Sequence, residues 1–331
     1  MRYGVSAERS EEMTISLGQS FQFYLQPVPP FDFELTVKKP VGWNLFNAGE
    51  ILEGKTFWTA TRLKGIMAGI RMESLGTIDD PRVRVSVFTK SKVAAADRKW
   101  MVKHLKTMIG ADQDLESFYA MAKKDDILKI TVKDLYGMHD TQTSYLYNSV
   151  VLSICLQMAR LDRSNKMIES INEHYGDPVA FDGKMIRVEP SAERIAGLKA
   201  GAFAKECNLG YRAKYLIRSA QMIVKGFPTS EQILSMSLQE AKSALMELPG
   251  VGDYAADIIN PHGGFPIDAW SVDVFGLLFF GKEPKNARAM IEKVKREGLK
   301  RWGNWAWMGF FYVAQDLENL SKSLGVRLRR F

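Results

Sequence analysis

One carboxylate in this sequence is placed where it could assist the cleavage of a bond. Asp268 lies in the segment Pro266-Ile267-Asp268-Ala269-Trp270, sixteen residues after Gly252, at the start of an apolar helical pattern. A fixed carboxylate stabilises positive charge that develops in a transition state, and it can also position a water molecule. Because Asp also caps helices well, the alternative role for Asp268 is to start the helix that follows it.

The residues before Asp268 predict a hairpin between two helices. Ser237 and Glu240 have the spacing of a capping box, so a helix begins there. The turn is Leu248-Pro249-Gly250-Val251-Gly252, and a second helix begins at Asp253. Glycines at a helix start leave backbone N–H groups uncovered, and such groups bind phosphate without reading base sequence. The expected phosphate-binding residues are Leu248, Gly250, Val251 and Gly252.

The hairpin, followed at this distance by an apolar residue and Asp, resembles the helix-hairpin-helix (HhH-GPD) superfamily of DNA glycosylases. Weaker similarity extends over most of the chain. The resemblance is to the 3-methyladenine DNA glycosylase II type, with additional similarity to 8-oxoguanine DNA glycosylases. It implies an enzyme that flips a damaged base out of the DNA duplex and cleaves its glycosidic bond, with Asp268 as the catalytic carboxylate.

Tyr254 departs from one branch of this superfamily. Bifunctional members carry a lysine at the second position after the hairpin, where its amine attacks the sugar. The order here is Gly252-Asp253-Tyr254, which implies a monofunctional enzyme that uses water and leaves an abasic site. Another lysine could still supply an amine, and the candidates are Lys205, Lys214 and Lys242. Tyr254 itself is expected either in the wall of the base pocket or in the core.

Four further residues are expected at the DNA because of the resemblance. The segment 208–215 reads NLGYRAKY, which is similar to a stretch in which Tyr wedges beside the extruded base and Arg contacts the opposite base; these positions are Tyr211 and Arg212. Met158 falls at the position that inserts into the base stack, and Arg163 falls at a base-contacting position. The alternatives are a packed tyrosine at 211 and a core methionine at 158.

Aromatic residues predict the chemistry of the base pocket. Trp270 stands where the 8-oxoguanine type usually has His, whereas the alkylation type tolerates Trp. Alkylated purines are electron-poor or cationic, so electron-rich rings bind them by stacking and cation–π attraction. The proposed walls are Tyr254, Trp270, Trp302 and Trp305, with Trp307 also available, although a tryptophan-rich core is the alternative for most of them.

Elements of an α+β protein are expected to position these residues. Residues 1–110 predict an N-terminal antiparallel β-sheet domain, with strands at 31–38 and 82–87, shorter strands within 47–76, and a helix at 91–108. From residue 112 the pattern is helical throughout, with a buried helix at 144–160. We expect a mostly helical core over 111–331, made of a subdomain at 111–225 and a second at 226–331 that holds the hairpin and the C-terminal helices.

Composition limits the binding partners and cofactors that the protein could have. The 331 residues carry a formal charge of +7, which suits double-stranded DNA containing damaged bases as the partner. The two cysteines, Cys155 and Cys207, exclude a four-cysteine iron–sulfur cluster. We expect no metal or other cofactor, apart from a structural monovalent cation that the hairpin could hold, and no obligate protein partner. Without a long apolar run or an apolar leader, an intracellular location in the cytoplasm or nucleoid is expected.

Two other functions remain open from the sequence. The first is an 8-oxoguanine glycosylase, with or without lyase activity, which the segment 208–215 favours and which Tyr254 and Trp270 oppose. The second is a lesion- or DNA-binding protein that keeps the hairpin but lacks activity, which Asp268 opposes.

Overall fold

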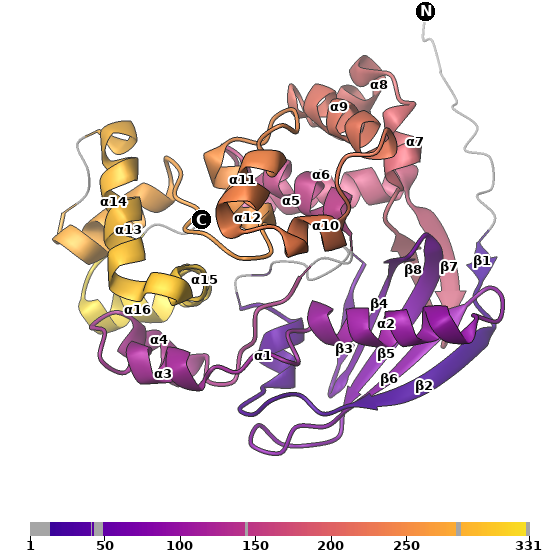
Figure 1. Cartoon of the computed structure of the whole chain (residues 1–331), viewed down its shortest axis with the longest axis horizontal. Coiled ribbons are helices and arrows are strands. Elements are labelled where there is room, and N and C mark those ends of the chain that lie inside the picture. Colours follow the sequence, from indigo (N-terminus) through magenta and orange to yellow (C-terminus); the bar gives the residue numbers. More distant parts are fainter. Residues whose placement is uncertain (1–13, 41, 43–48, 143–144, 283–285, 329–331) are drawn as a thin grey trace, which may run out of the picture.

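The computed structural model describes residues 14–40, 42, 49–142, 145–282 and 286–328. These residues form a β-rich unit and two helical units, with the β-rich unit at the lower right of Figure 1. Residues 47, 48 and 144, with which two of the expected elements begin, lie outside the described residues.

The larger sheet has five antiparallel strands in the order β2-β6-β5-β4-β3. Its strands are β2 (Gln19–Leu25), β3 (Ile51–Glu53), β4 (Thr56–Leu63), β5 (Ile66–Ser74) and β6 (Val83–Thr89). The predicted strands within 47–76 and at 82–87 are therefore confirmed, although two of those within 47–76 are not shorter, because β4 and β5 have eight and nine residues and β6 has seven. Val83, Val85 and Val87 alternate along β6 and are buried in one core with Met101 and Leu105 of helix α2 (Ala95–Met108), which crosses the sheet in Figure 1.

The prediction of a strand at 31–38 was wrong. Helix α1 (Phe33–Val37) occupies this segment, and the Asp32 side chain accepts a hydrogen bond from the Leu35 N–H at 2.9 Å. Phe33, Thr36 and Val37 are the buried residues of this helix, a spacing that fits one helical face. An N-cap aspartate followed by this spacing outweighs the alternation that we interpreted as a strand.

The prediction that the chain is helical throughout from residue 112 was also wrong. Strands β7 (Asp177–Phe181) and β8 (Lys184–Val188) form a hairpin, and β1 (Ile15–Ser16) pairs in parallel with β7. Asp182 and Gly183 at its turn both have positive φ, as a tight two-residue hairpin requires. Val179, Phe181, Ile186 and Val188 share a small core with Leu17 and Ala60, which attaches this hairpin to the larger sheet.

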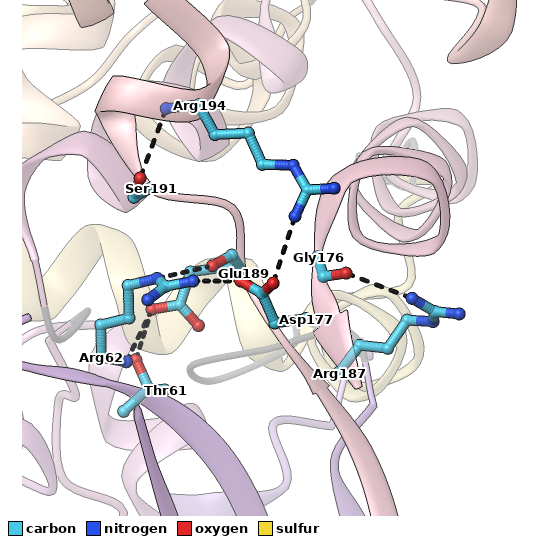
Figure 2. A network of polar contacts seen from close by, with 8 residues as sticks. All are labelled: Thr61, Arg62, Gly176, Asp177, Arg187, Glu189, Ser191 and Arg194. Carbon is cyan, nitrogen blue, oxygen red and sulfur yellow. Dashed lines mark hydrogen bonds and ion pairs between the residues drawn. The ribbon is translucent and has the colours of Figure 1, made fainter. Parts of the chain in front are cut away.

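A polar network joins β4 to the segment after β8 (Figure 2). The Glu189 carboxylate accepts hydrogen bonds from the Thr61 hydroxyl at 2.6 Å and from the Arg62 N–H at 3.0 Å. The Arg62 guanidinium donates to the Glu189 carbonyl and pairs with Asp177, and Arg194 pairs with the other oxygen of Asp177. These contacts fix the β-rich unit against the helical unit that carries the hairpin.

The first helical core contains the predicted hairpin. Its helices are α5 (Leu146–Leu156), α6 (Leu161–Tyr175), α7 (Ala192–Ala196), α8 (Ala200–Glu206), α9 (Arg212–Val224), α10 (Ser230–Ser235), α11 (Leu238–Leu245) and α12 (Asp253–Ile259). The buried helix expected at 144–160 is α5. The expected division at residue 225 therefore separates α5–α9 from α10–α12, although these helices share one core.

The second helical core combines segments far apart in the sequence, at the left of Figure 1. Its helices are α3 (Glu116–Ala122), α4 (Leu128–Asp134), α13 (Ser271–Phe280), α14 (Ala287–Trp302), α15 (Ala306–Gln315) and α16 (Leu317–Leu324), with the 3-10 turn η1 (Gly303–Trp305) before α15. Phe118, Phe275, Trp302 and Tyr312 are buried there. No helix in the described part of the chain is both long enough and apolar enough to cross a lipid bilayer.

Candidate functional site

The helix-hairpin-helix forms as predicted. The capping box of α11 is complete, because the Ser237 side chain accepts from the Glu240 N–H and the Glu240 side chain accepts from the Ser237 N–H. Gly250 has φ +85°, and a Cβ at this position would lie 2.7 Å from the Tyr215 ring. Gly252 is exposed and has open space around it. Gly250 is therefore needed for packing inside the protein, whereas Gly252 leaves its backbone open to a partner.

Tyr211 and the loop that carries Met158 lie beside this hairpin. A groove of about 570 Å³ is lined by residues that include Gln157, Tyr211 and the whole turn from Leu248 to Gly252. Met158 follows Gln157, is 64% exposed and has the left-handed φ of +50°, which non-glycine residues rarely adopt. The Gln157 side chain donates to the Gly250 carbonyl at 2.7 Å, and Tyr211 is 52% exposed. Two large apolar side chains thus stand in solvent beside the hairpin.

Arg212 lies in the interior, which differs from the expected contact with a base. It is 3% exposed, and its guanidinium donates to the carbonyl of Ile154 at 3.1 Å and to that of Gln157. The same guanidinium lies 4.8 Å from the centroid of the Tyr211 ring. Arg212 therefore holds the loop that carries Met158 against Tyr211. Arg163, by contrast, is exposed in the first turn of α6.

Asp268 is half-buried just before α13, and one of its oxygens is used locally. Oδ1 accepts hydrogen bonds from the Trp270 N–H at 2.9 Å, the Ser271 N–H at 2.8 Å and the Ser271 hydroxyl at 2.9 Å. Oδ2 accepts no hydrogen bond from the described residues. Asp268 therefore does cap α13 through Oδ1. The same hydrogen bonds hold the carboxylate in place and leave Oδ2 available for chemistry.

Tyr254 lies close enough to Asp268 for the carboxylate charge to affect its pKa. Burial, followed by the negative charge of the Asp268 carboxylate, raises the pKa of the Tyr254 phenol well above its usual range. Tyr254 is half-buried in the first turn of α12 and lines the same groove as the hairpin. Tyr254 therefore lines the groove and also lies within the electrostatic influence of the Asp268 carboxylate.

Lys242, which lies on the first helix of the hairpin, is held by two carboxylates. Its Nζ lies 2.5 Å from Asp253 Oδ1 and 2.7 Å from Asp257 Oδ1. Lys295 of α14 pairs with the other oxygens of the same two aspartates. Although burial opposes this, the two carboxylates raise the pKa of the Lys242 amine above its usual value, so the amine stays protonated. Lys205 and Lys214 are exposed, on α8 and α9.

The predicted tryptophan walls do not form one pocket. Trp302 is 2% exposed, and its indole N–H donates to the Asp125 carboxylate at 3.1 Å inside the second helical core. Trp305 packs against Phe118, with ring centroids 5.6 Å apart, beside the same core. Trp270 is 39% exposed next to Asp268. Trp302 is therefore a core residue. Of these three tryptophans, only Trp270 lies next to the candidate carboxylate, Asp268.

A cavity with aromatic lining residues at the other end of α12 was not predicted as such. It has a volume of about 410 Å³ and is lined by residues that include Lys39, Asp140, Pro261, Trp307 and Phe311. The rings of Trp307 and Phe311 are parallel to within 16°, with centroids 6.2 Å apart. The spacing of Trp307 and Phe311, four residues apart in one helix, was the available signal, because such residues share a face.

The groove and this cavity are linked by α12. The groove is lined by the N-terminal end of this helix, and the cavity by Ile258, Ile259 and the residues just after it. Seven helical residues span about 10 Å. No cluster of three or more His, Cys, Asp or Glu side chains suited to a metal ion occurs among the described residues.

Comparisons with known proteins place this architecture. The fold is that of the HhH-GPD DNA glycosylases. The 3-methyladenine DNA glycosylase of Archaeoglobus fulgidus superposes with a TM-score of 0.71 at 17% identity, over 90% of this chain and 99% of that one. The 8-oxoguanine glycosylase/lyase of Clostridium acetobutylicum, bound to DNA with cytosine opposite 8-oxoguanine, superposes with a TM-score of 0.68 at 18% identity, over 90% and 94%.

Sequence similarity gives the same result at lower coverage. The chain is 26% identical to the DNA-3-methyladenine glycosylase of Bacillus subtilis over 221 residues, which is 65% of this chain and 72% of that one. It is 32% identical to the N-glycosylase/DNA lyase OGG1 of Arabidopsis thaliana over 160 residues, 45% and 43% of the two chains. No family profile matches the chain. The chain thus resembles both glycosylase types, and the similarities support a DNA glycosylase of base excision repair.

Proposed function

We propose that the chain is a monofunctional DNA glycosylase that extrudes a damaged purine from duplex DNA and hydrolyses its glycosidic bond. The observation that carries this proposal is one groove lined by Tyr211 and the hairpin, with the exposed Met158 next to its lining residue Gln157 and with Tyr254, which is close enough to feel the charge of Asp268, in its wall. Exposed apolar side chains beside a phosphate-binding turn suit proteins that open a base step, because the wedge fills the space the base leaves.

The proposed reaction uses Asp268 as an electrostatic catalyst. As the bond to the base breaks, positive charge develops on the sugar, and the Oδ2 atom of Asp268 stabilises it and positions the attacking water. The three hydrogen bonds to Oδ1 hold the carboxylate in place before the reaction begins, so little reorganisation is needed. Tyr254 forms the wall on the DNA side.

We expect hydrolysis of the glycosidic bond without cleavage of the DNA strand, because the amines considered for attack on the sugar are absent or protonated. Position 254 carries no amine, and the Lys242 amine is protonated between two aspartates, so it cannot attack the sugar as a free base. The products are then a free base and an intact strand with an abasic site. The test is whether lesion-bearing duplex is cleaved only after treatment with alkali.

The hairpin is proposed to bind a DNA phosphate through its open amides. The N–H groups of Gly250 and Gly252 donate no hydrogen bond within the described residues, and they adjoin the positive end of α12. The Gly250 carbonyl is already occupied by Gln157, which fixes the orientation of the turn.

Gly252→Ala is expected to weaken DNA binding without destabilising the protein. A Cβ at Gly252 would contact no atom of the chain, and its φ of −96° suits any residue, so only a partner that approaches the backbone closely would be disturbed. We expect roughly tenfold weaker binding to damaged and undamaged duplex alike, about the contribution of one hydrogen bond to a charged group. Equilibrium titration of labelled duplexes, with melting temperatures alongside, measures both effects.

A matched control is Gly201→Ala on α8, where the added Cβ also meets no atom. It should leave duplex affinity unchanged. If Gly252→Ala weakened binding to one lesion only, the turn would be reading the base and the phosphate role would be wrong.

The extruded base is proposed to enter the cavity lined by Trp307 and Phe311. Its planar, nearly parallel rings suit a flat heterocycle, and its distance from the groove is about the length of α12. Alkylated purines were the expected substrate, on the basis of aromatic walls that included Trp302. Because Trp302 lies in the core, this support is reduced. An 8-oxoguanine glycosylase is the second candidate, and the buried Lys39 of the cavity favours it.

A further inference from the structure

Lys39 is a buried cation in the aromatic cavity. The residue is only 3% exposed, and its Nζ donates a hydrogen bond to the His139 carbonyl at 2.8 Å. The same Nζ lies 5.0 Å from the centroid of the Phe311 ring. An ammonium has three N–H donors, so two remain for other acceptors. Charged lysines are seldom buried without a role, which makes this position informative.

The position of Lys39 changes what the aromatic rings can bind. The face of Phe311 that would attract a cationic ligand already holds the protein's own ammonium. A purine alkylated on a ring nitrogen carries a positive charge in DNA, so the Lys39 ammonium would repel it at close range. A neutral base with a carbonyl oxygen would instead accept a hydrogen bond from the same ammonium.

Asp140 does not cancel this charge by direct pairing. Its Oδ2 accepts from the Trp307 indole N–H at 2.7 Å and its Oδ1 from the Thr141 N–H at 2.8 Å. The carboxylate therefore fixes the Trp307 ring. Burial, opposed by the charges of Asp140 and Glu50, lowers the pKa of the Lys39 ammonium to about 7, so a bound base that accepts a hydrogen bond from Nζ would favour the charged form and a cationic base would disfavour it.

We infer that Lys39 makes the cavity selective for a neutral purine that carries a carbonyl oxygen, and against a purine that carries a positive charge. The inference rests on the proposed function, which places the extruded base in this cavity. It assigns a specificity-determining role to a residue of the β-rich unit, 229 positions before Asp268 in the sequence.

The test is single-turnover excision from two matched duplexes, one with 8-oxoguanine and one with 7-methylguanine, each opposite cytosine. Both bases carry the C6 carbonyl of guanine, but 8-oxoguanine is neutral and has a second carbonyl at C8, whereas 7-methylguanine in DNA carries a positive charge and lacks the C8 carbonyl. The unmutated protein is expected to release 8-oxoguanine faster. Lys39→Met should shift the ratio of the two rates by roughly tenfold or more toward 7-methylguanine, because one charged hydrogen bond is lost and one repulsion is removed.

Two further variants separate selection from folding. Lys39→Gln keeps a donor without the charge, and its rate ratio should lie between those of the unmutated protein and Lys39→Met. Lys38→Met, at the exposed neighbouring residue, should leave the ratio unchanged. Melting temperatures show which variants are folded.

Equal loss of both rates in Lys39→Met and Lys39→Gln would mean a structural role and overturn the inference. An equal shift in Lys38→Met would also overturn it, because net charge alone would then explain the ratio. If the unmutated protein released neither base, the proposed function would fail, and the inference with it.

Discussion

Asp268→Asn is expected to lower the single-turnover rate of base excision by at least about 100-fold, which is the effect of removing one preorganised electrostatic group. Asn keeps an oxygen that can accept the three hydrogen bonds now made to Oδ1, so the cap of α13 should survive. What is lost is the negative charge beside the sugar. Binding to lesion-bearing duplex should change little, and excision under enzyme excess, with binding measured separately, distinguishes the two steps.

Asp273→Asn is the matched control, because Asp273 is a second carboxylate in the first turn of the same helix. It should keep excision close to that of the unmutated protein. An Asp268→Asn protein that excised at nearly the original rate would remove Asp268 from the chemistry and leave it only as a helix cap.

The second large effect is expected for Asp257→Asn, and it concerns stability. Asp257 is buried, and its two oxygens lie 2.7 Å from the Lys242 amine and 2.5 Å from the Lys295 amine. Without its charge, two ammonium groups would share the half-exposed Asp253. Breaking a buried ion pair on one side costs about 3 kcal/mol of the free energy of unfolding. Chemical denaturation of purified protein measures this loss.

The same change should also loosen the hairpin, because the network joins α11, α12 and α14. A parallel fall in duplex affinity is therefore expected. Asp126→Asn, which removes the charge from an exposed pair with Lys129, is the control and should leave stability nearly unchanged. Equal effects of the two substitutions would show that the buried network contributes no more than a surface pair.

Local signals explain what could be predicted from the sequence. The capping box at Ser237, the turn at Gly250 and the end of the turn at Gly252 depend on neighbouring residues, and all three are found as expected. The strands at 47–76 and 82–87 follow their alternation. The hairpin at 177–188 also had a local signal, because Asp182-Gly183 between alternating residues is typical of a tight turn. We overlooked that signal.

Tertiary contacts explain what could not be predicted. Arg212 is buried because two carbonyl groups of a distant loop accept its hydrogen bonds, and no pattern around residue 212 indicates this. Trp302 and Trp307 are both aromatic and close in sequence, but they point into a core and a cavity respectively. Lys39 belongs to a different unit from the hairpin, and a lysine is normally expected at the surface.

The most direct test of the account is the fate of a duplex that carries one damaged purine. The unmutated protein should leave the strand intact until alkali is added, and borohydride should trap no protein–DNA adduct, because position 254 carries no amine and two aspartates keep the Lys242 amine protonated. Tyr254→Lys should gain some trapping, and Tyr254→Met should not. Cleavage without alkali, together with strong trapping by the unmutated protein, would contradict the monofunctional mechanism, and no cleavage even after alkali, over a full panel of lesions, would indicate a DNA-binding protein without glycosylase activity.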